Sequence, residues 1–222
     1  MRAILLLSSL GLVGISHASL IINGGFENPV VFAPGGVVAY PGGSTGITGW
    51  TVTGSDVVLI NNTHTEAGPL VFNSQELFQH VDVTGAGNTG FSNGIFQNVP
   101  TTIGQIYNLS YWIGRANGAS NDPRYQTQST VFLGVGGMLV ASSTNADIGT
   151  TGTINWKSFS HSFTATTTST QIGFFNGTPD LAGGGNNFAG VDNVSMEAVP
   201  EPTTIFAMGA GLVALMKKRK KA

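Results

Sequence analysis

Short runs of alternating side chains constrain the fold of this chain more than any other feature. In residues 107–113, Tyr, Leu and Ile alternate with Asn, Ser and Trp, and in residues 158–163 Phe and His alternate with Ser. Successive side chains of a β-strand point to opposite faces, so both runs predict strands with one buried face. Further β-prone runs bounded by Gly, Asn, Pro or Asp span residues 76–83, 94–99, 129–135, 138–142, 171–175 and 188–196.

No long amphipathic helix interrupts these strands between residues 19 and 198, so the pattern predicts an all-β domain. About eight to ten short strands in one domain indicate a β-sandwich, and we expect a jelly roll. The paired glycines Gly136 and Gly137 predict a tight hairpin, because primed turns need positive φ angles. Residues 34–46 and 114–128 are polar or Gly-rich, and we expect long loops at the rims of the sandwich.

The N-terminus has the pattern of a secretory signal peptide. Arg2 provides a positive start, residues 3–15 are apolar, and small residues precede the junction of Ala18 and Ser19. Signal peptidase is therefore expected to remove residues 1–18. The alternative is an uncleaved anchor, and either form implies export across the inner membrane.

The C-terminus combines a rigid break, an apolar run and a cationic end. Val199-Pro200-Glu201-Pro202 is followed by 14 uncharged residues, 203–216, and then by five consecutive Lys or Arg. As a helix, the run would be about 21 Å long, which is short for a bilayer core of roughly 30 Å. The cations would stay cytoplasmic, leaving the rest of the chain outside. The run is apolar on all sides, which favours a membrane segment over the alternative, a buried helix with a solvated end. Its short length favours a temporary membrane segment over a permanent anchor.

These ordered features in residues 199–222 resemble the PEP-CTERM sorting signal of Gram-negative bacteria. The resemblance implies recognition by an exosortase, a membrane-embedded transpeptidase-like enzyme that would cut near Pro200-Glu201-Pro202. It also implies that the body, residues 19–198, is held only transiently at the inner membrane. The protein would then be released or attached to the cell surface or extracellular matrix.

Removal of both terminal segments changes the charge of the protein. Six of the nine Lys and Arg lie in those segments, so residues 19–202 carry three cations against eleven acids, a net charge of −8. Phosphate binding needs clustered cations, which argues against nucleic acid or anionic lipid as a ligand. Divalent cations and neutral glycans are compatible with such a body. The chain contains no Cys, so its stability must come from a hydrophobic core, with or without a metal.

A second resemblance covers most of the body. The opening residues 20–27 (LIINGGFE), residues 47–52 (ITGWTV), the hairpin around residues 156–166 and the closing residues 189–194 (AGVDNV) are similar to segments of galactose-binding-like jelly-roll domains, which include many carbohydrate-binding modules. The resemblance implies a sandwich that binds polysaccharide or packs in an extracellular matrix. It also implies that Glu27 and Asp192 hold a structural Ca²⁺, because such modules often carry one there. The alternative is that both are ordinary turn or capping acids.

Sugar sites combine aromatic faces with planar hydrogen-bonding groups. The loop at residues 115–125 gathers two of the body's three cations with amide, carboxyl and aromatic side chains, and is the best candidate by composition. The predicted glycan-binding residues are Arg115, Asn117, Asp122, Arg124, Tyr125 and Trp50. The alternatives are a solvated, ion-paired loop and, for Trp50, a place in the core.

The sequence carries no recognised catalytic motif. It has no G-x-S-x-G, H-E-x-x-H or phosphate loop, and the absence of Cys excludes a thiol nucleophile. His64 and His80 could contact a metal, whereas His161 alternates with two Phe and is expected to be half-buried. We therefore expect a non-enzymatic protein that binds a polysaccharide matrix. The alternatives are a structural biofilm or coat component that recognises no specific sugar, and a glycan hydrolase.

Overall fold

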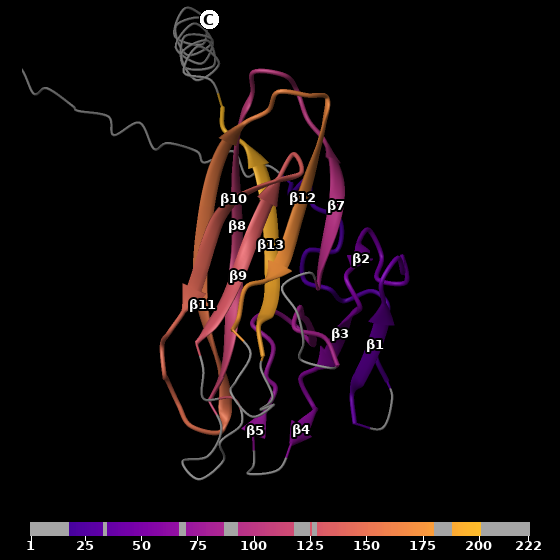
Figure 1. The fold of residues 1–222 in the computed structure, drawn as a ribbon, viewed down its shortest axis with the longest axis vertical. Coiled ribbons are helices and arrows are strands. Elements are labelled where there is room, and N and C mark those ends of the chain that lie inside the picture. Colours follow the sequence, from indigo (N-terminus) through magenta and orange to yellow (C-terminus); the bar gives the residue numbers. More distant parts are fainter. Residues whose placement is uncertain are drawn as a thin grey trace, which may run out of the picture.

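The computed structural model describes residues 18–32, 35–66, 70–86, 93–117, 125, 128–179 and 188–200. Within them, two β-sheets pack face to face, which confirms the predicted all-β sandwich (Figure 1). The finer assignment to the jelly rolls stays a prediction. No helix among the described residues is long and apolar enough to cross a membrane. The predicted signal peptide up to residue 17 and the apolar run at residues 203–216 lie outside the described residues.

Sheet A has eight strands, and the strand nearest the C-terminus lies in its middle. Its order is β1 (Val37–Pro41), β3 (Asp56–Asn61), β6 (Gln79–Asp82), β13 (Gly190–Ala198), β8 (Ile106–Asn117), β11 (Thr153–Thr164), β5 (Leu70–Val71) and β4 (Thr65–Glu66). Residues 20 and 24 also bond to β13: the Leu20 N–H donates to the Met196 carbonyl at 2.8 Å, and the Val194 N–H to the Gly24 carbonyl at 2.9 Å. The start of the body thus lies beside its last strand.

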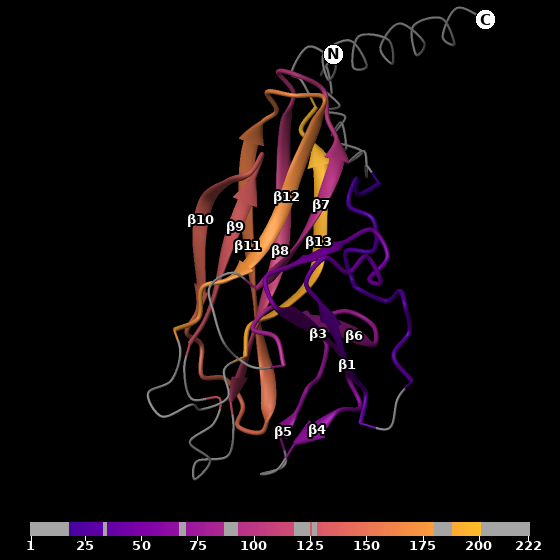
Figure 2. The ribbon, with the colours of Figure 1, turned by 45° about the vertical axis from the view of Figure 1, so that its right-hand side comes forward.

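Sheet B has five antiparallel strands. Its order is β10 (Met138–Asn145), β9 (Ser129–Val135), β12 (Ser169–Asn176), β7 (Gly94–Pro100) and β2 (Thr51–Thr53). The predicted Gly136-Gly137 hairpin joins β9 to β10, and both glycines have positive φ angles, 62° and 82°. Figure 2 shows sheet B covering one face of the long strands of sheet A.

The main core lies between the two sheets and is built by period-two alternation. On β8, Tyr107, Leu109, Tyr111 and Ile113 are buried as predicted. Trp50 is 1% exposed, and its ring lies 5.4 Å from that of Phe26 and 6.1 Å from that of Phe174. Burial of side chains of this size supplies most of the free energy that holds such a sandwich together.

Several predicted boundaries are confirmed and others are wrong. Residues 129–135 form β9 over the predicted range, and the predicted strand at 94–99 becomes β7. Residues 34–46 are not one long loop, because they contain β1. β1 is an edge strand, so Pro41 costs no hydrogen bond inside the sheet. The strand predicted at 76–83 shortens to β6, because peptide N–H groups of residues 76 and 78 donate to carboxylates instead of a neighbouring strand.

Candidate functional site

The outer face of sheet B carries phenylalanines and glycines in register on three neighbouring strands. In the central strand β12, Phe175 lies opposite Phe132 of β9 and Gly94 of β7. Two residues earlier, Gly173 lies opposite Gly134 of β9 and Phe96 of β7. The three phenylalanines are partly exposed on this face. We call Phe96, Phe132, Phe175 and the glycines between them the Phe–Gly platform.

Glycine lets the ring of Phe175 lie along the sheet. A Cβ atom on Gly173 would stand 2.7 Å from Cζ of Phe175, and one on Gly134 would stand 2.8 Å from its Cε2. A Cβ on Gly94 would stand 2.8 Å from Cδ1 of the same ring. Because the ring occupies the space above three glycines, it lies across the strands and turns one face outward.

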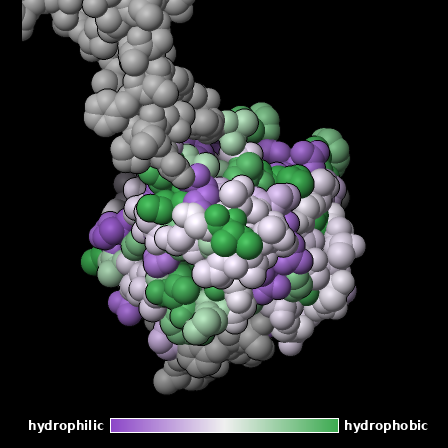
Figure 3. Space-filling model, turned by 90° about the horizontal axis from the view of Figure 1, so that it is seen from above, coloured by the Kyte–Doolittle hydropathy of each residue, from purple (hydrophilic) through white to green (hydrophobic). Residues whose placement is uncertain are grey.

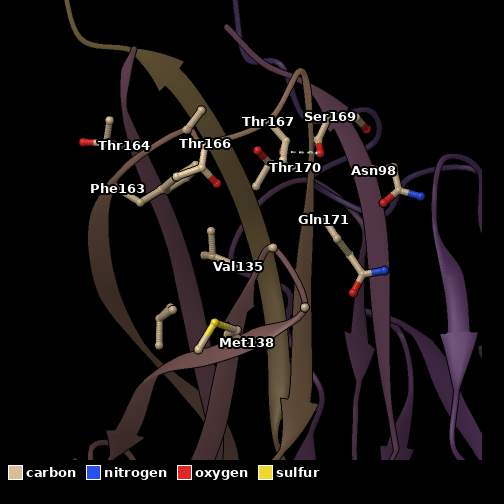
Figure 4. Close-up of a pocket in the computed structure, with 14 residues that line it drawn as sticks. Asn98, Val135, Met138, Phe163, Thr164, Thr166, Thr167, Ser169, Thr170 and Gln171 are labelled. Atoms are coloured by element: carbon tan, nitrogen blue, oxygen red, sulfur yellow. Dashed lines mark hydrogen bonds between the residues drawn. The ribbon is translucent and has the colours of Figure 1, made fainter. Parts of the chain in front are cut away.

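Two adjoining hollows lie over and beside this platform. The first, of about 310 Å³, is lined by Phe132, Gly134, Gly137, Met138, Leu139, Gln171 and Phe175. The second, of about 500 Å³, lies between the β9–β10 hairpin and the turn from β11 to β12 (Figure 4). Gly137, Met138 and Gln171 line both, so the hollows form one groove.

The groove offers free polar groups beside its apolar floor. Asn98 of β7 and Gln171 of β12 are register neighbours, and both line the second hollow (Figure 4). Neither side-chain amide bonds to another described residue. Hydroxyl groups of Thr164, Thr166 and Ser169 line the far end. Planar amides and hydroxyls both donate and accept hydrogen bonds, as a ligand rich in hydroxyl groups requires.

No ionisable side chain lines the described groove. Proton transfer and nucleophilic attack at neutral pH rely on a titratable group or an activated nucleophile. The groove is therefore suited to holding an uncharged ligand by stacking and hydrogen bonds.

The predicted glycan loop is anchored by the described members of its set. Arg115 is 8% exposed and donates from Nη1 to the Ala146 carbonyl at 2.7 Å, while Asn117 donates to the Ile148 carbonyl at 2.7 Å. Tyr125 is 6% exposed and donates its hydroxyl to Glu66 at 2.8 Å. Asp122 and Arg124 lie outside the described residues, so glycan contact by this loop stays a prediction.

Trp50 takes the alternative role considered for it. Its ring belongs to the core, and its Nε1–H donates to the Asn23 carbonyl at 3.1 Å. A side chain with 1% exposure cannot stack on a sugar, so the structure corrects its placement among the glycan-binding residues.

Glu27 and Asp192, from the opening and closing segments, both accept hydrogen bonds from the backbone of residues 75–79. Glu27 Oε1 accepts from the N–H groups of Phe78 and Gln79 at 2.8 and 3.0 Å. Asp192 accepts from the N–H groups of Gln75 and Glu76 at 2.9 and 3.0 Å. The two carboxylates therefore both hold the backbone of residues 75–79 in place by hydrogen bonds.

This arrangement does not fit the calcium site that the resemblance implies. Calcium needs six to eight oxygen ligands, whereas peptide N–H groups already converge on both carboxylates. No group of three acids, histidines or cysteines among the described residues could hold a metal ion. Burial raises the pKa of Asp192 to about 8, and the nearby charge of Glu76 contributes, although three backbone N–H groups act in the opposite direction. The calcium site stays an untested implication of the resemblance, and the contacts of Glu27 and Asp192 lead us to expect no ion there.

His80 and His64 pack against the second hydrophobic cluster, which lies apart from the main core. His80 is fully buried between Trp156 and Phe188, at ring distances of 5.3 and 5.7 Å, and its Nδ1 lies 3.2 Å from the Ser74 hydroxyl. Burial lowers the pKa of His80 to about 3, so it is neutral at physiological pH. His64 Nε2 lies 3.6 Å from Glu66, and its ring packs 5.0 Å from Phe72. These contacts assign both histidines to packing.

Sequence reasoning missed the platform residues, although a signal was present. Each of three predicted strands contains Gly and Phe two residues apart: Gly94 and Phe96, Phe132 and Gly134, and Gly173 and Phe175. Residues two apart share a face of a strand. The repeated spacing therefore predicts a Phe ring next to a Gly, which has no side chain, on one face of each strand. Only the strand order shows that these faces of β7, β9 and β12 lie next to one another.

Comparisons with known proteins give two results. Residues 198–220 match the model of the PEP-CTERM protein-sorting motif, which includes Val199, Pro200, Glu201 and Pro202. Glu201 and Pro202 lie outside the described residues. No curated protein matches the sequence.

Among solved structures, the fold is similar to the Stig cyclase Fisc from Fischerella sp. TAU, solved with an indole compound, at a TM-score of 0.57 and 16% identity. That match covers 83% of this chain and 98% of the cyclase. An apo cyclase from Fischerella sp. gives 0.54 and 17%, covering 83% and 97%. A structure described as CBM4 gives 0.37 and 16%, covering 81% and 99%, a score too low to carry an argument. The chain is therefore a β-sandwich protein that ends in a PEP-CTERM sorting motif, which implies export and processing by an exosortase.

Proposed function

We propose that the sandwich binds a neutral polysaccharide of the cell surface or extracellular matrix along the groove of sheet B. One observation carries the proposal: Phe175 lies flat over Gly134 and Gly173 and lines the same hollow as Gln171, whose register neighbour Asn98 lines the adjoining hollow. The C–H face of a pyranose packs on such a ring, while its hydroxyl groups need planar donors and acceptors. The sorting motif supports a location where polysaccharide is available.

The same groove supports binding and not catalysis. Glycan hydrolysis needs two placed carboxyl groups, and the described groove is lined by none. Release of reducing ends from any polysaccharide by the purified protein would overturn this part of the proposal.

A pull-down tests the binding site. The exported protein is incubated with insoluble cellulose, xylan, mannan and β-glucan, and the bound fraction is compared with that of Phe175→Ala. Loss of one stacking ring, worth up to about 1.5 kcal/mol, should weaken binding about tenfold. Ser160→Ala, at an exposed position of β11 in sheet A, is the matched control. Equal binding by Phe175→Ala and wild type would refute this site.

The same assay tests the predicted glycan loop with a double variant, Arg124→Ala combined with Tyr125→Ala. Loss of binding in this variant with retention in Phe175→Ala would move the site to the loop. If no polysaccharide is retained by the wild type, the structural coat alternative gains support. One observation favours that alternative: β10 is an eight-residue edge strand without charge, and such edges pair with other chains.

A further inference from the structure

Both ends of the body leave the sandwich at one pole. The Ser19 hydroxyl accepts a hydrogen bond from the Met196 N–H at 3.2 Å, next to the bond between Leu20 and Met196. Ser19 follows the predicted signal-peptidase site, and Met196 lies two residues before the matched sorting motif. We call this end, formed by residues 18–20, 100–106, 164–169 and 197–200, the chain-end pole; Figure 3 looks down on it.

The folded body extends into the sorting motif without a linker. The Val199 N–H donates to the Ile106 carbonyl at 2.8 Å, and the Gln105 amide donates to the Val199 carbonyl at 2.7 Å. Val199 is the second residue of the matched range 198–220. The sandwich therefore fixes the chain up to the residue before Pro200.

This anchoring limits how far the body can stand from a membrane. Only Pro200, Glu201 and Pro202 separate Val199 from the apolar run at 203–216. Three extended residues span at most about 11 Å. When the apolar run enters the bilayer, the chain-end pole must lie at the bilayer surface. A signal peptide that leaves from Ser19 would place its tether at the same pole.

The surface of the pole suits that position. Its exposed apolar side chains are Leu20, Ile103, Ile106 and Val199, at 38%, 63%, 46% and 39% exposure. Thr and Ser provide most of its polar groups, and Glu197 is its one charged residue. The body as a whole is acidic, so other surfaces would be repelled by anionic lipid within the Debye length of about 8 Å. The chain-end pole can approach lipid at little electrostatic cost.

We infer that, before the tail is cut, the chain-end pole lies in the headgroup region of the bilayer, with Leu20, Ile103, Ile106 and Val199 in contact with lipid. Apolar side chains of this kind insert shallowly at the interface while the polar groups contact headgroups. The sorting motif is then presented at the membrane surface, where a membrane-embedded exosortase can reach it without unfolding of the body. This inference does not depend on glycan binding.

The chain has no Cys, which allows site-specific labelling. Full-length Ile103→Cys and Ile106→Cys are labelled with a polarity-sensitive fluorophore and inserted into vesicles of phosphatidylethanolamine and phosphatidylglycerol. The control is Thr65→Cys, an exposed position on β4 at the opposite end of the molecule (Figures 1 and 2). We expect blue-shifted emission and severalfold stronger quenching by headgroup-level lipid quenchers at 103 and 106 than at 65.

Two results would overturn the inference. One is equal emission and quenching at all three sites in vesicles that contain the inserted chain. The other is protection of positions 103 and 106 only when the vesicles also contain exosortase, because the pole would then bind the enzyme and not lipid. Thermal melting of the three labelled proteins confirms that each is folded, and failure of one of the two pole variants leaves the other as the test.

Discussion

The two sheets differ sharply in charge. The five strands of sheet B contain no ionisable side chain. The charged or titratable residues in the strands of sheet A, apart from tyrosines, are Asp56, Glu66, His80, Asp82, Arg115, Lys157, His161, Asp192 and Glu197. Ionisable side chains within the strands are therefore confined to sheet A, and the outer face of sheet B is suited to the uncharged ligand that we propose. The two sheets should respond separately to mutation and to pH.

A larger side chain in place of a glycine of the Phe–Gly platform should have the largest effect on polysaccharide binding. Valine at Gly173 would place Cβ 2.7 Å from Cζ of Phe175 and displace the ring from the sheet. We expect Gly173→Val to weaken polysaccharide binding more than tenfold, because stacking is lost and the methyl groups enter the groove. Ser160→Val, on the outer face of sheet A, should bind as wild type. Undiminished binding by a folded Gly173→Val protein would break the distinction between the sheets.

A change of pH should act on sheet A alone. Burial raises the pKa of Asp192 from 3.8 to about 8, so between about pH 7 and pH 8 the folded state holds a proton that the unfolded state has lost. Stability should therefore fall as pH rises through this window. His80, with a pKa lowered to about 3, and Asp82, with a pKa raised to about 6, are already deprotonated there when folded.

The measurement is the unfolding midpoint at several pH values for wild type and Asp192→Asn. The variant should have a lower midpoint, because an amide replaces an acceptor of three N–H groups, and a flatter profile. Polysaccharide binding should not change over the same range. A parallel loss of binding and stability would show that the sheets are coupled.

Loss of one amide in the groove should have a smaller effect. Gln171→Leu keeps the size of the side chain but removes both hydrogen-bonding groups. A net hydrogen bond is worth about 1 kcal/mol, so binding should weaken about fivefold. Asn108→Leu, at an exposed position on the outer face of sheet A, is the control for added apolar surface. Similar affinities for both variants would show that Gln171 does not contact the ligand.

Addition of Ca²⁺ should have the smallest effect, a nearly unchanged melting temperature. Because peptide N–H groups already bind Glu27 and Asp192, we expect nearly equal melting temperatures in Ca²⁺ and in chelator. A binding ion would instead raise the midpoint with concentration. A rise of several degrees that Glu27→Gln abolishes would establish the metal site that the family resemblance implies, and it would add a third contribution to the stability of sheet A.

Local patterns predicted what depends on near neighbours in the chain. The alternation in β8 and the Gly136-Gly137 turn are properties of a few consecutive residues, so the strand and the hairpin were predictable. β1 was not predictable, because its flanking sequence is Gly-rich and the strand is stabilised by pairing with β3. The platform needs three strands in one order and register, which no single segment specifies. The burial of Trp50 likewise depends on a contact with Phe174, which is distant in sequence.

The hydrogen bond between Leu20 and Met196 brings the first and last residues of the sandwich together. The fold therefore does not require the chain to begin and end at these positions. A short linker between Ser19 and Val199 could close the backbone into a ring, and a circular permutant could open it at another exposed turn, such as the one near Ile148, which is 65% exposed. Such a protein would have neither terminal signal and would keep both sheets. It would separate what the fold does from how the cell delivers it.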